Sequence, residues 1–216
     1  MNYYSSFIIL VSCIIIVSCA FYKGIKEGLT TSDNIVLFGD SVLNNSKYVN
    51  ADQSVVDNLK IKTKNVFSFA QDGATIVDCY SQLDTASSDL NTSNTYIFIS
   101  AGGNDLLNER EPLTPSVISD LFSNYLDFIR SVKVKFPNAK INIFNLYQPA
   151  NPRYNSYKAS IDQWNKLIQD NSGKIGLMYN VLDLHSLLNT PNDFVYDIEP
   201  SQEASKKIAN LIYLTR

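Results

Sequence analysis

Histidine and cysteine are scarce in this chain of 216 residues. His185 is the only histidine, and two of the three cysteines, Cys13 and Cys19, lie in an apolar N-terminal segment. Cys79 is therefore the only cysteine in the rest of the chain, so no internal disulfide can form there. No Cys/His spacing typical of zinc binding is present, and an oxidising compartment is neither required nor excluded.

An excess of basic residues is also lacking. The 18 lysines and arginines are outnumbered by 21 aspartates and glutamates, which gives a net charge of -3 and a pI near 5.1. The chain has no basic stripe of the kind that binds nucleic acids. It also has no P-loop, no glycine-rich dinucleotide motif and no internal repeat. We therefore expect no nucleic-acid partner and no cofactor.

Residues 1–29 differ in character from the remainder. The stretch from Phe7 to Tyr22 carries no charge, and Lys23 and Lys26 follow it directly. Its length lies between that of a signal-peptide core and that of a full membrane span. It predicts a membrane-directed segment, either a cleaved signal, including a lipoprotein-like signal ending at Cys19, or an uncleaved anchor. The lysines after the apolar run leave the topology open.

Residues 30–216 alternate short β-rich runs with longer amphipathic stretches. The expected strands are Asn34–Phe38, Asn65–Phe69, Thr95–Ser100, Ile141–Leu146 and Gly176–Leu184. The expected helices are Val55–Leu59, Thr75–Leu83, Val117–Phe136, Ser156–Ile168 and Gln202–Leu214. This alternation is typical of a five-stranded parallel sheet with helices on both faces, a three-layer α/β/α sandwich. It predicts a single α/β domain.

Three polar motifs follow the first three expected strands. They are Gly39-Asp40-Ser41, Gly73, and Gly102-Gly103-Asn104-Asp105. Each alone is compatible with an ordinary turn. In a parallel sheet, however, the carboxyl ends of the strands share one edge, where ligands bind. Together the motifs indicate a serine nucleophile facing donors for an oxyanion.

This combination resembles the SGNH hydrolase superfamily, also called GDSL esterases or lipases, over nearly all of residues 30–216. The resemblance implies a flavodoxin-like fold in which Ser41 is the nucleophile. It also implies that the oxyanion is held by the backbone N–H of Ser41, the backbone N–H of Gly73 and the side chain of Asn104. Val42 stands where the family usually has leucine, which is a tolerable apolar change.

The family's last motif, Asp-x-x-His-Pro, is altered here. Pro200-Ser201 fits its context, but Glu199 stands at the histidine that acts as general base and Tyr196 at the aspartate that orients it. A carboxylate is a weak base at neutral pH unless burial or a neighbouring charge, such as Asp197, raises its pKa. Alternatively, Glu199 only begins the final helix, where negative charge is favourable. His185, at the end of the last expected strand, is the other candidate base.

The sequence thus predicts a serine-dependent esterase acting on a carboxylic ester, either an O-acetyl sugar or a lipid acyl ester. The alternatives are an O-acyltransferase, or a membrane-tethered binding protein that kept the crevice but lost catalysis. We expect the segment Leu106–Pro115 to shape the pocket. Four aromatic residues after the fourth strand either line a sugar-binding rim or pack helices: Tyr147, Tyr154, Tyr157 and Trp164.

Overall fold

The computed structural model describes residues 33–109, 113–174 and 176–216. The predicted membrane-directed segment at residues 1–29 lies outside them, and so do residues 110–112 of the expected pocket segment. In the part of the chain that is described, no helix combines the length and apolarity of a membrane span. The division at residue 30 stays a prediction.

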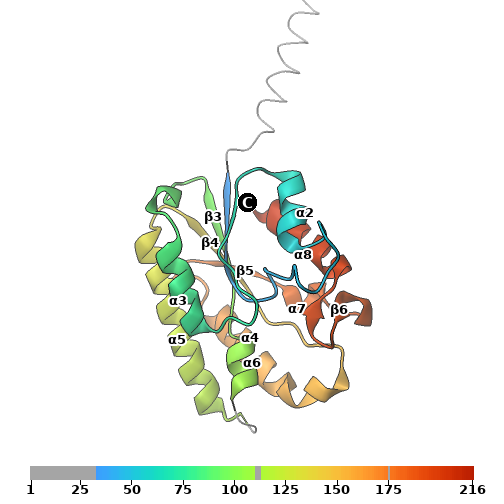
Figure 1. The fold of residues 1–216 in the computed structure, drawn as a ribbon. Coiled ribbons are helices and arrows are strands. Elements are labelled where there is room, and N and C mark those ends of the chain that lie inside the picture. The colour runs from blue at the N-terminus through green and yellow to red at the C-terminus, as the bar shows by residue number, and fades with distance from the viewer. Residues whose placement is uncertain (1–32, 110–112, 175) are drawn as a thin grey trace, which may run out of the picture. The chain divides into compact units, whose positions relative to one another are not determined.

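Five parallel strands form the central sheet, in the order β2-β1-β3-β4-β5 (Figure 1). The strands are β1 (Asn34–Gly39), β2 (Val66–Ser68), β3 (Thr95–Ser100), β4 (Lys140–Phe144) and β5 (Asn180–Leu182). The middle strands are buried almost throughout, because helices cover both faces. The predicted three-layer α/β/α fold with a five-stranded parallel sheet is confirmed.

Two groups of helices cover the sheet (Figure 1). One face packs against α3 (Ile76–Thr85), α5 (Pro115–Lys135) and α6 (Lys158–Asn171). The other packs against α2 (Val55–Lys62), the short α7 (Leu184–Leu187) and α8 (Gln202–Thr215). The sequence of α5 explains its place, because its buried residues recur every three or four positions and form one apolar stripe. They are Ile118, Phe122, Tyr125, Phe128, Ile129 and Val132.

The C-terminal third departs most from the predicted elements. The expected strand 176–184 is reduced to β5, because Asp183 accepts a hydrogen bond from the backbone of Ser186 and starts α7. A hairpin of β6 (Phe194–Val195) and β7 (Glu199–Pro200) was not predicted. Neither was the short α4 (Gly103–Asn108) nor the 3-10 helices at Ser88–Leu90, Pro152–Tyr157 and Pro191–Asp193. Strands of two residues carry too little sequence for a periodicity to be recognised.

The strand order changes direction at β1, which has β2 on one side and β3 on the other. In open α/β sheets a ligand crevice forms at such a switch point, beyond the carboxyl ends of the strands. Gly39 ends β1 and pairs with Ser100 at the end of β3. The turn that follows β1 therefore begins at the edge where a ligand is expected.

Gly39 has no room for a side chain. Its φ is +136°, and a Cβ atom would lie 1.8 Å from the carbonyl oxygen of Ser100. The buried side chain of Gln82 also holds this residue, since its Oε1 accepts from the Gly39 N–H at 2.7 Å and its Nε2 donates to the Gly39 carbonyl at 2.8 Å. The backbone at the end of β1 is therefore held by Ser100 on one side and by the Gln82 side chain on the other.

Gly39→Ala should destabilise the domain by more than about 3 kcal/mol, because overpacking against backbone adds to the cost of a positive φ. Gly173→Ala is the matched control. Gly173 also has a positive φ, +81°, but nothing lies within 4 Å of its Cβ position. Urea unfolding should show a loss of only about 1–2 kcal/mol for the control. Equal losses in the two variants would contradict the role of the Ser100 contact.

Candidate active site

Ser41 lies in a turn organised by its neighbour Asp40. The Asp40 carboxylate accepts from the backbone of Val42 at 3.1 Å and from the Ser100 hydroxyl at 3.0 Å. The backbone carbonyl of Asp40 accepts from the N–H groups of Leu43 and Asn44. These bonds close the turn directly after β1, so Ser41 is held against the sheet edge and is only 9% exposed.

Asn104 lies in the first turn of α4, after the turn that ends β3. Its side-chain Nδ2 donates to the carbonyl of Ala74 at 2.9 Å, and the carboxylate of Asp105 accepts from the backbone of Ile76 at the start of α3. The loop after β2, which carries Gly73, is thereby tied to the loop after β3. Gly73 is exposed and has a φ of +76°.

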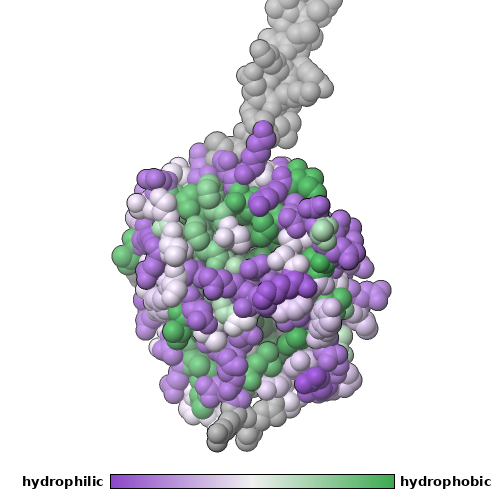
Figure 2. Space-filling view, in the orientation of Figure 1, coloured by the Kyte–Doolittle hydropathy of each residue, from purple (hydrophilic) through white to green (hydrophobic). Residues whose placement is uncertain are grey.

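Ser41, Asn104 and Glu199 line one pocket of about 650 Å³, including space open to solvent. Figure 2 shows one face of the molecule, on which apolar residues gather in the upper half and again in the lower half beside a small hollow. Gly73 is not among the residues that line the pocket. The remaining lining is mostly apolar and comes from α4, from the segment after β4, from α6 and from the turn between β6 and β7. It includes Leu106, Leu107, Leu146, Pro149, Ile161 and Ile198.

Glu199 lies beside the serine. Burial raises the pKa of its carboxyl group above the ordinary value, a hydrogen bond with the Ser41 side chain opposes this rise, and the negative charge of Asp72 adds to it. Its second oxygen, Oε2, is buried and has no hydrogen-bond partner among the described residues. A carboxylate whose pKa is raised is a better proton acceptor than one of ordinary pKa. Glu199 thus has the contact and the environment of a base toward Ser41.

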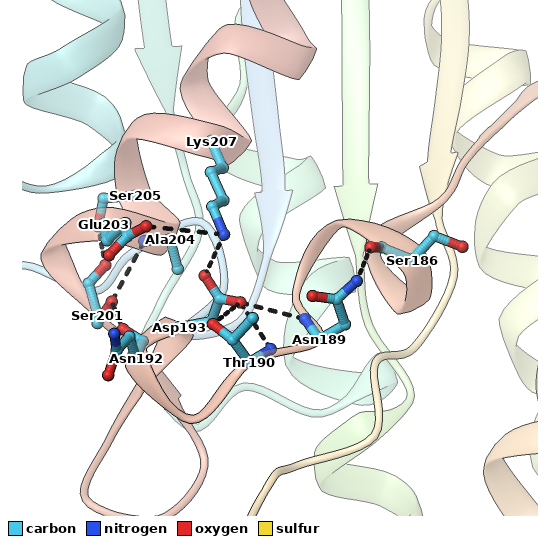
Figure 3. Close-up of polar contacts among 10 residues, drawn as sticks. All are labelled: Ser186, Asn189, Thr190, Asn192, Asp193, Ser201, Glu203, Ala204, Ser205 and Lys207. Atoms are coloured by element: carbon cyan, nitrogen blue, oxygen red, sulfur yellow. Dashed lines mark hydrogen bonds and ion pairs between the residues drawn. The ribbon is translucent and has the colours of Figure 1, made fainter.

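The loop before the hairpin is anchored by a buried ion pair. Asp193, which is fully buried, binds Lys207 of α8 at 2.6 Å and also accepts from Asn189 and Thr190 (Figure 3). Burial alone would raise the pKa of Asp193, but these partners, led by Lys207, together lower it. The backbone carbonyl of Asp193 also accepts from Ser201, so both ends of the hairpin are fixed to α8.

Asn45 connects the turn that carries Ser41, here called the serine turn, to the β6-β7 hairpin. Its side-chain Nδ2 donates to the carbonyl of Pro200 at 3.1 Å and to the Ser205 hydroxyl at 2.6 Å, while its Oδ1 accepts from the backbone of Val55 at 3.0 Å. Asn45 is fully buried. One side chain therefore sets the distance between the loop after Ser41 and the residue next to Glu199.

Two expectations about the base are corrected by this geometry. Glu199 belongs to β7 and does not begin α8, whose N-cap is Ser201. Asp197 does not raise the pKa of Glu199, because its carboxylate binds Asn151 at 2.7 Å and Arg153 at 3.2 Å; the charge of Asp72 does so instead.

His185 also lies elsewhere than expected. It belongs to α7 and not to the end of a strand, and it does not line the pocket of Ser41. Its backbone N–H donates to Asn145, and its Nδ1 is buried without a hydrogen-bond partner among the described residues. Strand periodicity alone did not indicate this short helix.

The four aromatic residues have different places. Trp164 is 0% exposed and packs under the turn at Gly102, so it forms no rim. Tyr147, Tyr154 and Tyr157 do line the pocket. The hydroxyl of Tyr147 donates to the carbonyl of Ile198 at 2.9 Å, which joins the segment after β4 to the hairpin.

The fold is of the type found in SGNH hydrolases. A family model of GDSL-like lipases and acylhydrolases matches residues 35–212. The chain belongs to the GDSL-like lipase/acylhydrolase family, and the resemblance seen in the sequence is confirmed. No protein of curated function matches the sequence.

Solved structures share the fold at low identity. A lipolytic G-D-S-L protein from Veillonella parvula is 16% identical, with a TM-score of 0.67 over 85% of this chain and 97% of that chain. An acetyl xylan esterase is 13% identical, with a TM-score of 0.62 over 84% and 98%. A psychrotrophic esterase from Pseudoalteromonas, inhibited by monoethylphosphonate, is 16% identical, with a TM-score of 0.56 over 84% and 95%. At such identities the likeness concerns the fold alone.

Several residues that build the site were not found from the sequence. Gln82, Asn45, Asp193 and Lys207 act through contacts between segments far apart in the chain. Buried Asn and Gln side chains have no local pattern that separates them from exposed ones. Only the capping position of Ser201 before an apolar stripe was readable as a local signal.

Burial raises the pKa of Asp40 to about 7, against the hydrogen bonds from Val42 and Ser100 that lower it, and Glu199 adds to the rise. Between about pH 4 and 7 the folded state therefore holds a proton that the unfolded state has lost, so stability falls as the pH rises.

Asp40→Asn should remove this fall of up to a few kcal/mol, because asparagine has no proton to lose in this range. The turn itself should be kept, because the amide oxygen can still accept both hydrogen bonds. The measurement is urea unfolding at several pH values, compared with the natural protein. Parallel pH profiles for the two proteins would show that Asp40 does not titrate in this range.

Proposed function

We propose that this protein is a serine-dependent esterase that hydrolyses a carboxylic ester, with Ser41 as nucleophile and Glu199 as general base. The observation that carries the proposal is the contact of the Ser41 side chain with the half-buried carboxyl group of Glu199, whose pKa is raised, in a pocket that also contains Asn104. Membership of the GDSL-like lipase/acylhydrolase family supports it. The Pseudoalteromonas relative is an esterase inhibited by a phosphonate, a reagent that mimics the reaction at a serine.

In the proposed reaction Ser41 Oγ attacks the ester carbonyl while Glu199 accepts the hydroxyl proton. The resulting oxyanion is held by the Asn104 amide and by the backbone N–H of Ser41, both in the pocket. The family resemblance adds the backbone N–H of Gly73, which lies outside the pocket lining in this structure. When the tetrahedral adduct collapses, the C–O bond to the alcohol breaks and Glu199 returns the proton to the leaving oxygen. Water then attacks the acyl-enzyme with Glu199 again as base, which releases the carboxylic acid and restores Ser41.

The pocket favours an acyl chain longer than acetyl. Its walls are built mainly from leucine, isoleucine, proline and tyrosine side chains, and each methylene buried there is worth about 0.8 kcal/mol. Of the two ester classes that the sequence suggested, the apolar lining supports the lipid-like acyl ester. A membrane-directed segment at residues 1–29 would place such an enzyme at a membrane or outside it.

Two other functions share this site. An O-acyltransferase would pass the same acyl group to a second hydroxyl instead of water. A binding protein without catalysis would keep the pocket for its ligand, and it is favoured by one observation: the only histidine lies outside the pocket. The alternatives differ in whether Ser41 is activated, which can be measured directly.

Labelling of the full chain with a fluorophosphonate, followed by intact mass, should give one adduct per chain that requires Ser41. The rate should rise with pH as Glu199 loses its proton, at a pH above the usual range for glutamate, because burial raises its pKa. Glu199→Gln should lose this rise and react about 100-fold more slowly. Asp40→Asn should keep it, which separates the two carboxyl groups.

Ser41→Ala is the control for unspecific labelling. Full labelling of that variant would refute the nucleophile, and normal labelling of Glu199→Gln would refute the base. A folded natural protein that forms no adduct at any pH would favour the non-catalytic binding protein.

A preference for chain length tests the acyl pocket. We expect kcat/KM to be at least about tenfold higher for 4-nitrophenyl hexanoate than for the acetate, since four additional methylenes enter apolar surroundings. Leu107→Trp should fill part of the pocket and reduce hexanoate turnover while sparing acetate. Leu214→Trp, which changes an exposed leucine outside the pocket, is the matched control. A loss for both esters in Leu107→Trp would argue against this acyl site.

A further inference from the structure

Two tyrosines stand near Glu199 outside the acyl pocket. Tyr48 follows the serine turn, and Tyr196 lies in the turn between β6 and β7; their ring centroids are 5.9 Å apart. Neither ring lines the pocket. The charge of Glu199 nevertheless acts on the Tyr48 hydroxyl and contributes to raising its pKa. Val195, the residue before Tyr196, pairs with Glu199 across the β6-β7 hairpin. The two rings therefore lie close to the proposed base but outside the acyl walls.

Tyr196 has an unusual backbone conformation and is exposed. Its φ is +47°, and the residue is 74% exposed. A large residue adopts this left-handed region only at a cost, and asparagine or glycine would fit it better. An exposed aromatic ring at such a position contributes little to folding. Backbone strain of this kind is often found where a residue has a functional role.

The turn is held in this shape by its neighbour. Asp197, with a φ of +73°, accepts from Asn151 at 2.7 Å and pairs with Arg153 at 3.2 Å. These contacts fix the tip of the hairpin to the segment after β4. The ring of Tyr196 is thereby presented in a defined place instead of on a free loop.

Tyr48 is fixed as well. Its hydroxyl donates to Asp72 Oδ1 at 2.7 Å, and Lys47 pairs with Asp72 Oδ2 at 3.0 Å. The hydrogen bond to Asp72 is the main reason that the pKa of Tyr48 is raised, so its hydroxyl stays protonated. Tyr48 therefore offers a ring of fixed position beside the ring of Tyr196.

We propose that Tyr48 and Tyr196 form a subsite for the alcohol part of the ester and that this alcohol carries a six-membered ring. The proposal rests on the esterase function above. An ester bound to Ser41 extends in two directions from its carbonyl carbon, and the apolar pocket takes the acyl chain. The alcohol then lies beside Glu199, which must reach its oxygen to return the proton. An aryl ring, or the C–H face of a pyranose ring, can stack on tyrosine there.

The test compares three hexanoate esters that differ only in their alcohol: ethyl, benzyl, and the 6-O-ester of methyl glucoside. The full chain should hydrolyse at least one ring ester with a higher kcat/KM than the ethyl ester, chiefly through a lower KM. Tyr196→Asn removes the ring but suits a positive φ, so the turn should be kept. It should lower kcat/KM for that ring ester about two- to tenfold and leave the ethyl ester unchanged.

Tyr196→Phe is the matched control and should behave as the natural protein, because it keeps the ring. An effect on the benzyl ester alone, or on the glucoside ester alone, identifies which kind of ring the subsite takes. An equal loss for all three esters in Tyr196→Asn, or no loss for any, would overturn the subsite.

If no ester is hydrolysed, the esterase proposal fails but the subsite can still be judged. Calorimetric binding of N-benzylhexanamide and N-ethylhexanamide then replaces turnover. Tighter binding of the benzyl amide that is lost in Tyr196→Asn supports the subsite. Equal binding of the two amides by the natural protein excludes it.

Discussion

The close approach of β1 and β3 at Gly39 and Ser100 is the contact on which the site depends. Because Gly39 has no side chain, the backbone of Ser100 can lie where a Cβ atom would be. Ser100 then serves the serine turn twice, since its carbonyl accepts from the Asp40 N–H at 3.1 Å and its hydroxyl donates to the Asp40 carboxylate. The position of Ser41 follows from these two strand ends and from the Gln82 side chain that holds Gly39.

A second constraint is electrostatic. Asp40 and Glu199 are carboxyl groups near one serine, and the causes that raise their pKa values are burial and nearby negative charge. A histidine that accepts a proton changes from neutral to positive. A glutamate in the same role would change from negative to neutral. The carboxyl group of Glu199, the proposed base, is therefore stabilised in its protonated form by its low-polarity surroundings.

The hairpin that carries Glu199 is unusually well anchored for two strands of two residues each. Asp193 and Lys207 hold it to α8, Asn45 holds it to the serine turn, and Tyr147 holds it to the segment after β4. Such a network limits the movement of Glu199 relative to Ser41. Pre-positioned groups are what a proton transfer between two side chains requires. The same anchoring makes the exposed, strained Tyr196 a ring of fixed position.

The sequence by itself determined the sheet, the order of its layers and the placing of Ser41 and Asn104 at strand ends. These features depend on apolar runs and glycine turns that are local in the chain. The tertiary structure alone decided that Glu199 faces Ser41, that His185 does not line the pocket, and that Asp72 replaces Asp197 as the charge beside Glu199. It also decided the buried contacts of Gln82, Asn45 and Asp193. Such contacts join residues far apart in the chain, and pairing of this kind leaves no periodic signal for a sequence to show.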